Sequence, residues 1–181
     1  MPRAEIPENV LKYLQWCSKE VGKYSEDSFN CDLWNSFTDQ IISSPIEQLL
    51  YTSMRAFCVF NNIDLKDFDE NYGTTLDPQY KINKYTVDFL IRHWLKTPKT
   101  DIENKVVVEC DGHDFHDKNE KQRRYEKQRD RFLQSIGYKV IHFTGSEVYS
   151  DPMRCAKECM CLVMGWEQDR DFIQLDSNIL D

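Results

Sequence analysis

Two strand-like segments in the middle of the chain constrain its fold most. Residues 85–94 alternate between apolar and polar side chains, which is typical of a strand with one face against a core. Residues 105–111 form a β-branched run, which indicates a central strand. We expect the two to pair as a hairpin whose connector, residues 96–104, is centred near Pro98-Lys99. The odd positions of the first strand are expected to share one face: Tyr85, Val87, Phe89 and Ile91.

Helix signals and weaker strand signals surround this hairpin. Residues 44–47, Ser-Pro-Ile-Glu, match an N-cap, a first helical position and a capping-box glutamate. Asp117 and Glu120 repeat the capping-box pattern, and Gly137 suits the left-handed position after the helix that they open. The stretch around Tyr72-Gly73 is expected to be a loop. The predicted helices cover residues 7–21, 45–60, 117–137 and 151–166, and the remaining strands cover residues 79–82 and 139–143.

The order of these elements predicts the fold class. We expect an α/β domain in which helices flank a central sheet, and the sheet mixes an antiparallel hairpin with a strand reached through a helical crossover. The 181 residues contain no internal repeat, low-complexity tract or glycine-rich linker, so one domain spanning residues 1–181 is expected. Its core is placed at about residues 44–160, after an N-terminal helical extension at about residues 5–40.

The distribution of charge limits what the chain can bind. The net charge is −8 at pH 7, which argues against a protein that coats nucleic acid, because affinity for phosphates comes from cationic side chains. Residues 118–131 are nevertheless basic, and a local contact with DNA is expected there. A solvated helical face with internal ion pairs is the alternative. The candidate contacts are Lys118, Lys121, Arg124, Lys127 and Arg131.

Three carboxylates are expected to gather where the two central strands pair. The hairpin places Asp88 opposite Glu109, and strand alternation puts Asp111 on the same face as Glu109. Cys110 points the other way. Like charges raise each other's pKa, and unpaired buried carboxylates are strongly unfavourable. A Mg²⁺ or Mn²⁺ ion removes the conflict, and it can lower the pKa of water and stabilise charge on a phosphoryl oxygen. An exposed sheet edge with solvated acids is the alternative.

These residues lie in motifs that resemble those of a known nuclease superfamily. The motifs are Tyr85-Thr86-Val87-Asp88-Phe89, Val108-Glu109-Cys110-Asp111-Gly112-His113, Arg129-Asp130 with Leu133 and Gly137, and Phe143-Thr144-Gly145-Ser146-Glu147. Over residues 44–159 the ordered set resembles the PD-(D/E)xK, or restriction-endonuclease-like, superfamily. Within it, the set resembles endonucleases related to very-short-patch-repair enzymes. The resemblance implies a restriction-endonuclease-like αβββαβ core, a mixed central sheet flanked by helices, with extra N- and C-terminal helices.

The resemblance also implies roles for individual residues. Asp88 and Glu109 would bind Mg²⁺ or Mn²⁺, helped by the main-chain carbonyl of Cys110. Asp111 stands where the superfamily usually has a lysine that orients or activates the attacking water. His116 matches the second of two histidines in the very-short-patch-repair enzymes, and we expect it to transfer a proton.

Two further candidates are implied near that site. Glu47 matches a glutamate that some members carry on the first core helix, although the capping-box role explains it equally well. Lys121 or Lys127 could supply the missing cation from the helix that follows. The implied function is a metal-dependent endonuclease that hydrolyses DNA with metal-activated water. A catalytically inactive nuclease-like domain that binds DNA or a protein partner is the alternative, because the usual lysine is absent and the net charge is acidic.

The cysteines and the remaining histidines are expected to be structural. The seven cysteines are scattered through apolar runs, which fits reduced thiols better than a disulfide framework. Cys155, Cys159 and Cys161 match no common zinc spacing and are expected in the core. His93 and His142 lie in apolar strand contexts. No apolar stretch of about 18 residues and no secretory signal pattern is present, so we expect a cytoplasmic protein with no membrane partner.

Overall fold

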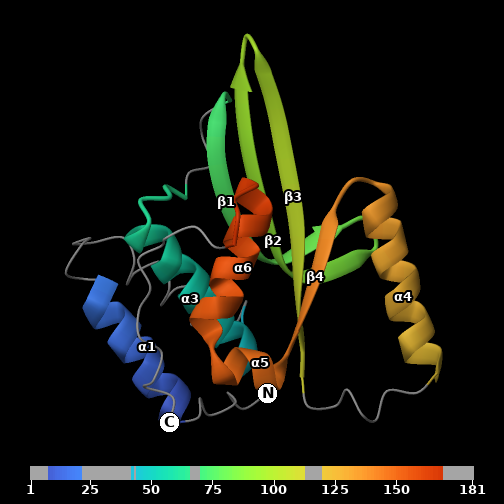
Figure 1. The fold of residues 1–181 in the computed structure, drawn as a ribbon. Coiled ribbons are helices and arrows are strands. Elements are labelled where there is room, and N and C mark those ends of the chain that lie inside the picture. The colour runs from blue at the N-terminus through green and yellow to red at the C-terminus, as the bar shows by residue number, and fades with distance from the viewer. Residues whose placement is uncertain (1–7, 22–41, 43, 66–69, 113–119, 169–181) are drawn as a thin grey trace.

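A mixed four-stranded sheet forms the centre of the computed structural model. The strands are β1 (Tyr72–Ile82), β2 (Tyr85–Thr97), β3 (Thr100–Asp111) and β4 (Lys139–Thr144). They lie in that order, with β1 to β3 antiparallel and β4 parallel to β3. This arrangement confirms the predicted fold class (Figure 1). The structure describes residues 8–21, 42, 44–65, 70–112 and 120–168.

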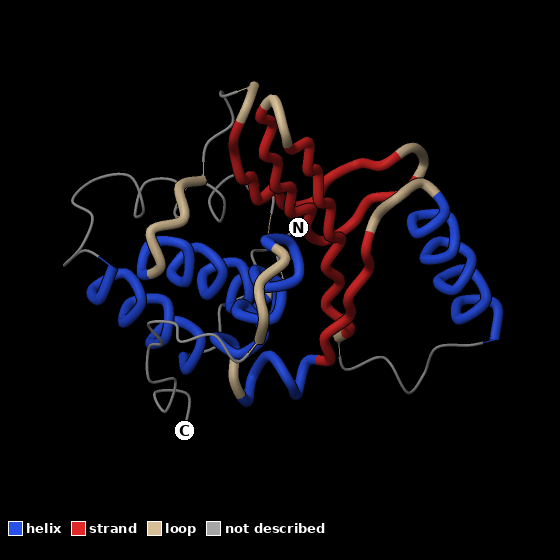
Figure 2. Tube along the Cα trace, turned by 45° about the horizontal axis from the view of Figure 1, so that its top comes forward, coloured by secondary structure: helices blue, strands red, loops and turns tan. Residues whose placement is uncertain are grey.

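Helices cover both faces of the sheet. They are α1 (Glu8–Val21), α3 (Pro45–Phe60), α4 (Glu120–Ser135), α5 (Gly145–Ser150) and α6 (Pro152–Met164). Helix α3 packs on α1 and α6, and α6 contacts β2 and β3, so these three helices form one layer. Helix α4 connects β3 to β4 and lies apart from that layer, on the other side of the sheet (Figures 1 and 2).

Two hydrophobic clusters hold the helices to the sheet, one on each face. The larger cluster lies between the sheet and the layer of α1, α3 and α6, and its strand residues are Leu76, Phe89, Ile91, Val106, Val108 and Phe143. The smaller cluster lies beneath α4 and consists of Ile82, Val87, Leu90, Val107 and Leu133. Because burial of apolar surface contributes about 25 cal/mol per Å², both layers stabilise the position of β3 at the centre.

The face assignment predicted for β2 is wrong on one side of Asp88. Val87 belongs to the cluster beneath α4, whereas Phe89 belongs to the cluster on the opposite face. Regular alternation would have put both on one face. The interruption lies where Gln79 of β1 adopts a φ of +50°, between pairs that keep the same register. The side chains of β2 therefore switch from one face of the sheet to the other at Asp88, opposite Gln79 of β1.

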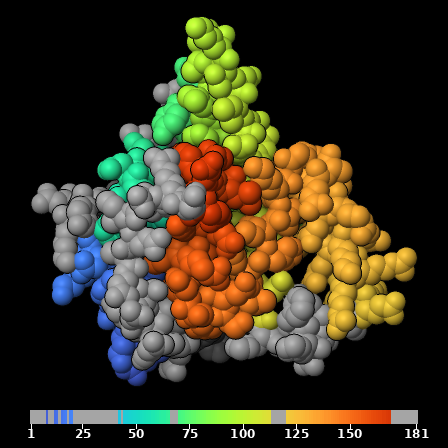
Figure 3. Space-filling view, viewed as in Figure 1, coloured from blue at the N-terminus to red at the C-terminus, as the bar shows by residue number. Residues whose placement is uncertain are grey.

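The hairpin formed by β2 and β3 is longer than predicted. The turn falls at Pro98-Lys99 as expected, but the predicted connector over residues 96–104 is wrong, because Thr97 already pairs with Thr100. Residues 101–103 are exposed. This part of the strand faces no core, so its sequence lacks the pattern of a buried strand. The end of the hairpin projects beyond the helices (Figure 3).

Strand β1 begins earlier than predicted, and the loop expected at Tyr72-Gly73 is wrong. Gly73 pairs with Trp94 across the sheet. A Cβ atom added to Gly73 would meet the Trp94 ring at 2.2 Å. This glycine therefore marks a close approach of a side chain to the backbone within a strand, and not a turn.

The helix ends test the capping predictions. Helix α3 spans the predicted residues, but the capping box is wrong, because the Ser44 side chain makes no capping hydrogen bond. The predicted end of α4 is confirmed: the N–H of Tyr138 donates to the carbonyl of Leu133 at 3.1 Å, and Gly137 takes a φ of +92°. Asp117, predicted to open α4, lies outside the described residues.

The cysteines at the C-terminal end of the fold pack in the core, as predicted. Cys155, Cys159 and Cys161 are buried on α6, and burial raises the pKa of the Cys155 thiol to about 12. His93 is also buried, with its Nδ1 3.1 Å from the Thr74 hydroxyl oxygen. Across the described ranges, no helix is long and apolar enough to cross a membrane.

Candidate active site

Asp88 and Glu109 lie on neighbouring strands. Phe89 and Val108 form the last antiparallel pair of this ladder, and Asp88 and Glu109 are the residues directly beyond it on the two strands. The main-chain N–H of Cys110 donates a hydrogen bond to Asp88 Oδ2 at 2.8 Å. The side chain of Cys110 packs against the larger hydrophobic cluster, on the face away from Glu109, as alternation predicted. The backbone of β3 thus holds both carboxyl groups in place.

Glu109 is buried and carries one unsatisfied oxygen. Its residue is 6% exposed, and its Oε2 lies 3.1 Å from Nη1 of Arg129 on α4. Its Oε1 is buried and has no hydrogen-bond partner in the described structure. Burial, reinforced by the charge of Asp88, raises the pKa of Glu109 to about 8. The site therefore holds more negative charge than Arg129 compensates.

Glu47 joins the same electrostatic environment from the first turn of α3. Gln79 Nε2 donates a hydrogen bond to Glu47 Oε2 at 2.9 Å. Burial, with the charge of Asp88 next in importance, raises the pKa of Glu47 to about 7. Burial also raises the pKa of Asp88. Gln79, the residue with the left-handed backbone, therefore connects Glu47 to the position of the other carboxylates.

Asp111 takes part in a second polar chain that links the sheet to α4. His142 on β4 places Nδ1 3.3 Å from Asp111 Oδ2 and Nε2 3.1 Å from Asp130 Oδ2. Arg129 Nε lies 3.4 Å from Asp130 Oδ1. Arg129 and Asp130 thus brace the helix against the sheet.

The basic residues of α4 fall into two groups. Arg129 alone is placed by a described contact against a predicted site residue, Glu109. Lys127 is exposed, and its position on the helix is roughly 200° around from Arg129, so it faces away from the sheet. That Lys121 or Lys127 supplies the cation stays a prediction, and Arg129 is the basic residue that contacts Glu109. The exposed members of the predicted DNA surface are Lys121, Arg124, Lys127 and Arg131.

Two predicted site residues, His116 and Lys118, lie outside the described residues. The structure adds three residues that the sequence did not place in the site: Gln79, Arg129 and His142. His142 could have been found from the register, since it pairs with Glu109 across the parallel β3–β4 ladder. Gln79 gives no sequence signal, because its role follows from an unusual backbone angle.

The oxygen ligands around Glu109 fit a hard divalent cation. Among the described residues no three His, Cys, Asp or Glu side chains form a metal cluster. Mg²⁺, however, is often bound by only one or two protein carboxylates, with water as the other ligands. Asp88 and Glu109 supply two such carboxylates. An ion there would satisfy the buried Glu109 Oε1. The main-chain carbonyl of Cys110 stays a predicted ligand.

The sheet order and the helices on its two faces are those of a restriction-endonuclease-like core, which makes the chain a nuclease-like domain. The model of the restriction-endonuclease-like family described as REase_MTES_1575 matches residues 64–161, more than half of the 181 residues. The chain belongs to this family. The match includes Asp88, Glu109, Asp111 and Arg129. Neither a curated protein nor a solved structure matches the chain.

Proposed function

We propose that this protein is a Mg²⁺- or Mn²⁺-dependent endonuclease that hydrolyses phosphodiester bonds in DNA. The observation that carries the proposal is the buried, unpartnered Oε1 of Glu109 beside Asp88, in a domain of a restriction-endonuclease-like family. The motifs around these two residues resemble those of very-short-patch-repair-like enzymes, which supports DNA as the substrate.

Asp88 and Glu109 would hold the ion. When bound, Mg²⁺ or Mn²⁺ would lower the pKa of water and stabilise negative charge on a phosphoryl oxygen. Asp88 is oriented for this by the N–H of Cys110, and Glu109 by Arg129. Glu47, with its raised pKa, can hold or release a proton near neutral pH at the edge of the same site.

Arg129 takes the place of the absent lysine as the cation next to the carboxylates. Its side chain is 13% exposed and lies between Glu109 and Asp130. A guanidinium can donate to two oxygens at once, so Arg129 can contact a phosphate while it keeps one protein partner. Asp111 contacts His142, so it acts in this proposal by positioning β4 and α4 around the site.

The test is cleavage of single-stranded, duplex and branched DNA with Mg²⁺, Mn²⁺ or EDTA. The wild-type protein should cut at least one substrate only with a metal ion, and Glu109→Gln should lose about 100-fold or more of the rate, as removal of a key electrostatic group does elsewhere. Glu103→Gln is the matched control, since Glu103 lies on the same strand but is exposed and pairs with Lys105. Binding without cleavage by the wild-type protein would instead identify an inactive nuclease-like domain.

A further inference from the structure

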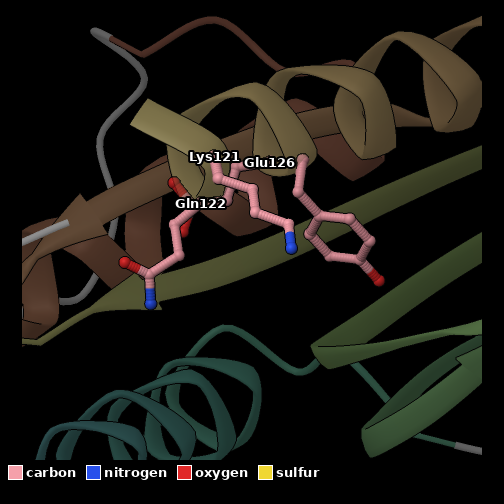
Figure 4. Close-up of a pocket in the computed structure, with 4 residues that line it drawn as sticks. Lys121, Gln122 and Glu126 are labelled. Atoms are coloured by element: carbon pink, nitrogen blue, oxygen red, sulfur yellow. The ribbon is translucent and has the colours of Figure 1, made fainter. Parts of the chain in front are cut away.

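An open hollow lies along the first turns of α4. Its volume is about 370 Å³. Figure 4 shows Lys121 and Gln122 extending from the helix into it. The lining residues are Lys121, Gln122, Tyr125 and Glu126. Neither the metal ligands nor Arg129 belong to this lining, so the proposed chemistry leaves the hollow without a role.

Tyr125 presents an exposed aromatic ring that other rings hold from behind. The residue is 52% exposed. Its ring centroid lies 5.8 Å from that of Tyr85 in an edge contact, and the Tyr85 centroid lies 5.5 Å from that of Phe132. Tyr85 itself is only 7% exposed. The exposed ring therefore rests on a buried aromatic support that limits its orientations.

The ring lies one helical turn from the site. Tyr125 precedes Arg129 by four residues, so the two side chains share one face of α4 at a separation of about 6 Å along the axis. Arg129 contacts Glu109. Successive nucleotides in a DNA strand rise by about 3.4 Å in the duplex. A base on Tyr125 would therefore belong to a nucleotide one or two positions from a phosphate contacted by Arg129.

The lining chemistry suits a base better than a phosphate. A carboxylate, Glu126, lies in the lining and would repel a phosphate. The carboxylate of Glu126 and the amide of Gln122 match the donors and acceptors on base edges. Lys121 in the lining and Arg124 on the neighbouring exposed surface can contact phosphates of the same strand. An aromatic ring with basic residues around it is the combination that binds single strands.

We infer that this hollow binds an unpaired nucleobase stacked on Tyr125, and hence that the substrate strand is single-stranded or opened beside the scissile phosphate. A base within a regular duplex is already stacked on both faces, so a protein ring reaches it only after it leaves the stack. The position of the scissile phosphate in this inference rests on the proposed function. The stacking itself depends only on the hollow and on Tyr125.

Binding measured in EDTA tests the stacking on Tyr125 separately from the proposed metal-dependent cleavage. We would measure the affinity for a short single-stranded oligonucleotide containing 2-aminopurine, and for the same sequence as a duplex, and follow 2-aminopurine quenching. Tyr125→Ala should weaken single-strand binding about tenfold or more and abolish the quenching, because base stacking on an aromatic side chain has that magnitude. Tyr125→Phe should keep both. Ile136→Ala is the matched control, since Ile136 is a 47% exposed apolar residue just beyond the far end of α4.

The outcomes distinguish this inference from the proposed function. Equal single-strand affinity in Tyr125→Ala and the wild-type protein, or equal losses in Tyr125→Ala and Tyr125→Phe, would overturn the stacking site. So would a wild-type protein that binds no single strand, which would leave Tyr125 as a contact for a protein partner. Metal-dependent cleavage that persists in those cases would leave the nuclease proposal intact. Binding that depends on Tyr125 without cleavage would support the stacking site and contradict the nuclease proposal.

Discussion

At the scale of single residues, the surroundings of Glu109 affect its ionisation in two opposite directions. Its burial and the neighbouring Asp88 disfavour the ionised form, whereas Arg129 favours it. The two side chains of the ion pair are only 8% and 13% exposed, so solvent screens them little. Removal of one partner from such a pair leaves the other charge buried without compensation. The attraction between the two side chains therefore adds less to stability than the removal of one of them would cost, because the remaining charge would be buried without a partner.

Arg129→Met is expected to lower the free energy of unfolding by about 3 kcal/mol at about pH 9, where Glu109, whose pKa is about 8, is ionised and would stay buried without a counter-charge. Chemical denaturation measures this. The double variant Arg129→Met with Glu109→Gln should recover most of the loss. Arg124→Met, on the exposed side of the same helix, should change stability by no more than about 0.5 kcal/mol. Equal losses in the single and double variants would contradict this account.

His93 gives a prediction about pH. Burial lowers the pKa of His93 below 6.5. The folded protein then binds fewer protons than the unfolded chain, so this contribution to stability is complete above the unfolded-state pKa and is lost as the pH falls through the folded-state pKa. The stability of the wild-type protein relative to His93→Gln should therefore decrease between about pH 7.5 and about pH 5. Parallel pH profiles of the two proteins would show that His93 does not titrate as described.

At the scale of elements, the sequence predicted what the core determines and missed what geometry alone determines. The α3 helix and the β-branched half of β3 were found because their burial imposes a period that the sequence must follow. The outer half of the hairpin was missed because its residues 101–103 face solvent and carry no such pattern. The change of face at Asp88 was missed because it follows from the backbone angle of Gln79.

The close approach of the Trp94 ring explains why a glycine, Gly73, stands near the start of β1. Gly73→Ala would place a methyl group 2.2 Å from the Trp94 ring, and an indole ring in a strand cannot move aside as freely as a flexible chain end. We expect a loss of about 1–3 kcal/mol in the free energy of unfolding, measured by denaturant titration. Gly112→Ala is the control, because nothing lies within 4 Å of its added Cβ. A Trp94→Leu background should relieve most of the loss, and the idea fails if it does not.

At the scale of the whole molecule, the candidate site is made by six elements that the chain order separates, including β1 with Gln79 and β4 with His142. Glu47 comes from α3, Asp88 from β2, Glu109 and Asp111 from β3, and Arg129 and Asp130 from α4. Strand spacing predicted that Asp88 and Glu109 lie near each other, and the N–H of Cys110, next to Glu109, donates a hydrogen bond to Asp88. The contact of Arg129 with Glu109 could not be predicted, because the sequence of a helix face gives no information on which residue of the sheet it meets.

Metal ions should stabilise the folded protein as a whole. Binding to the native state alone at one hundred times the dissociation constant raises the free energy of unfolding by about 2.7 kcal/mol. The midpoint of thermal unfolding should therefore rise with Mg²⁺ or Mn²⁺ and return to its starting value with EDTA. Glu103→Gln should behave like the wild-type protein, and Glu109→Gln should not respond. An equal response in both variants would place any bound ion elsewhere.

The long β2–β3 hairpin has a practical consequence for handling this protein. Its turn, Pro98-Lys99, is exposed and begins ten residues beyond Asp88, which corresponds to about 33 Å at about 3.3 Å per residue. Exposed turns far from the core tolerate inserted peptides well. A surface tether or a fluorescent reporter inserted between Pro98 and Lys99 would leave both α4 and the carboxylates free to engage a nucleic acid.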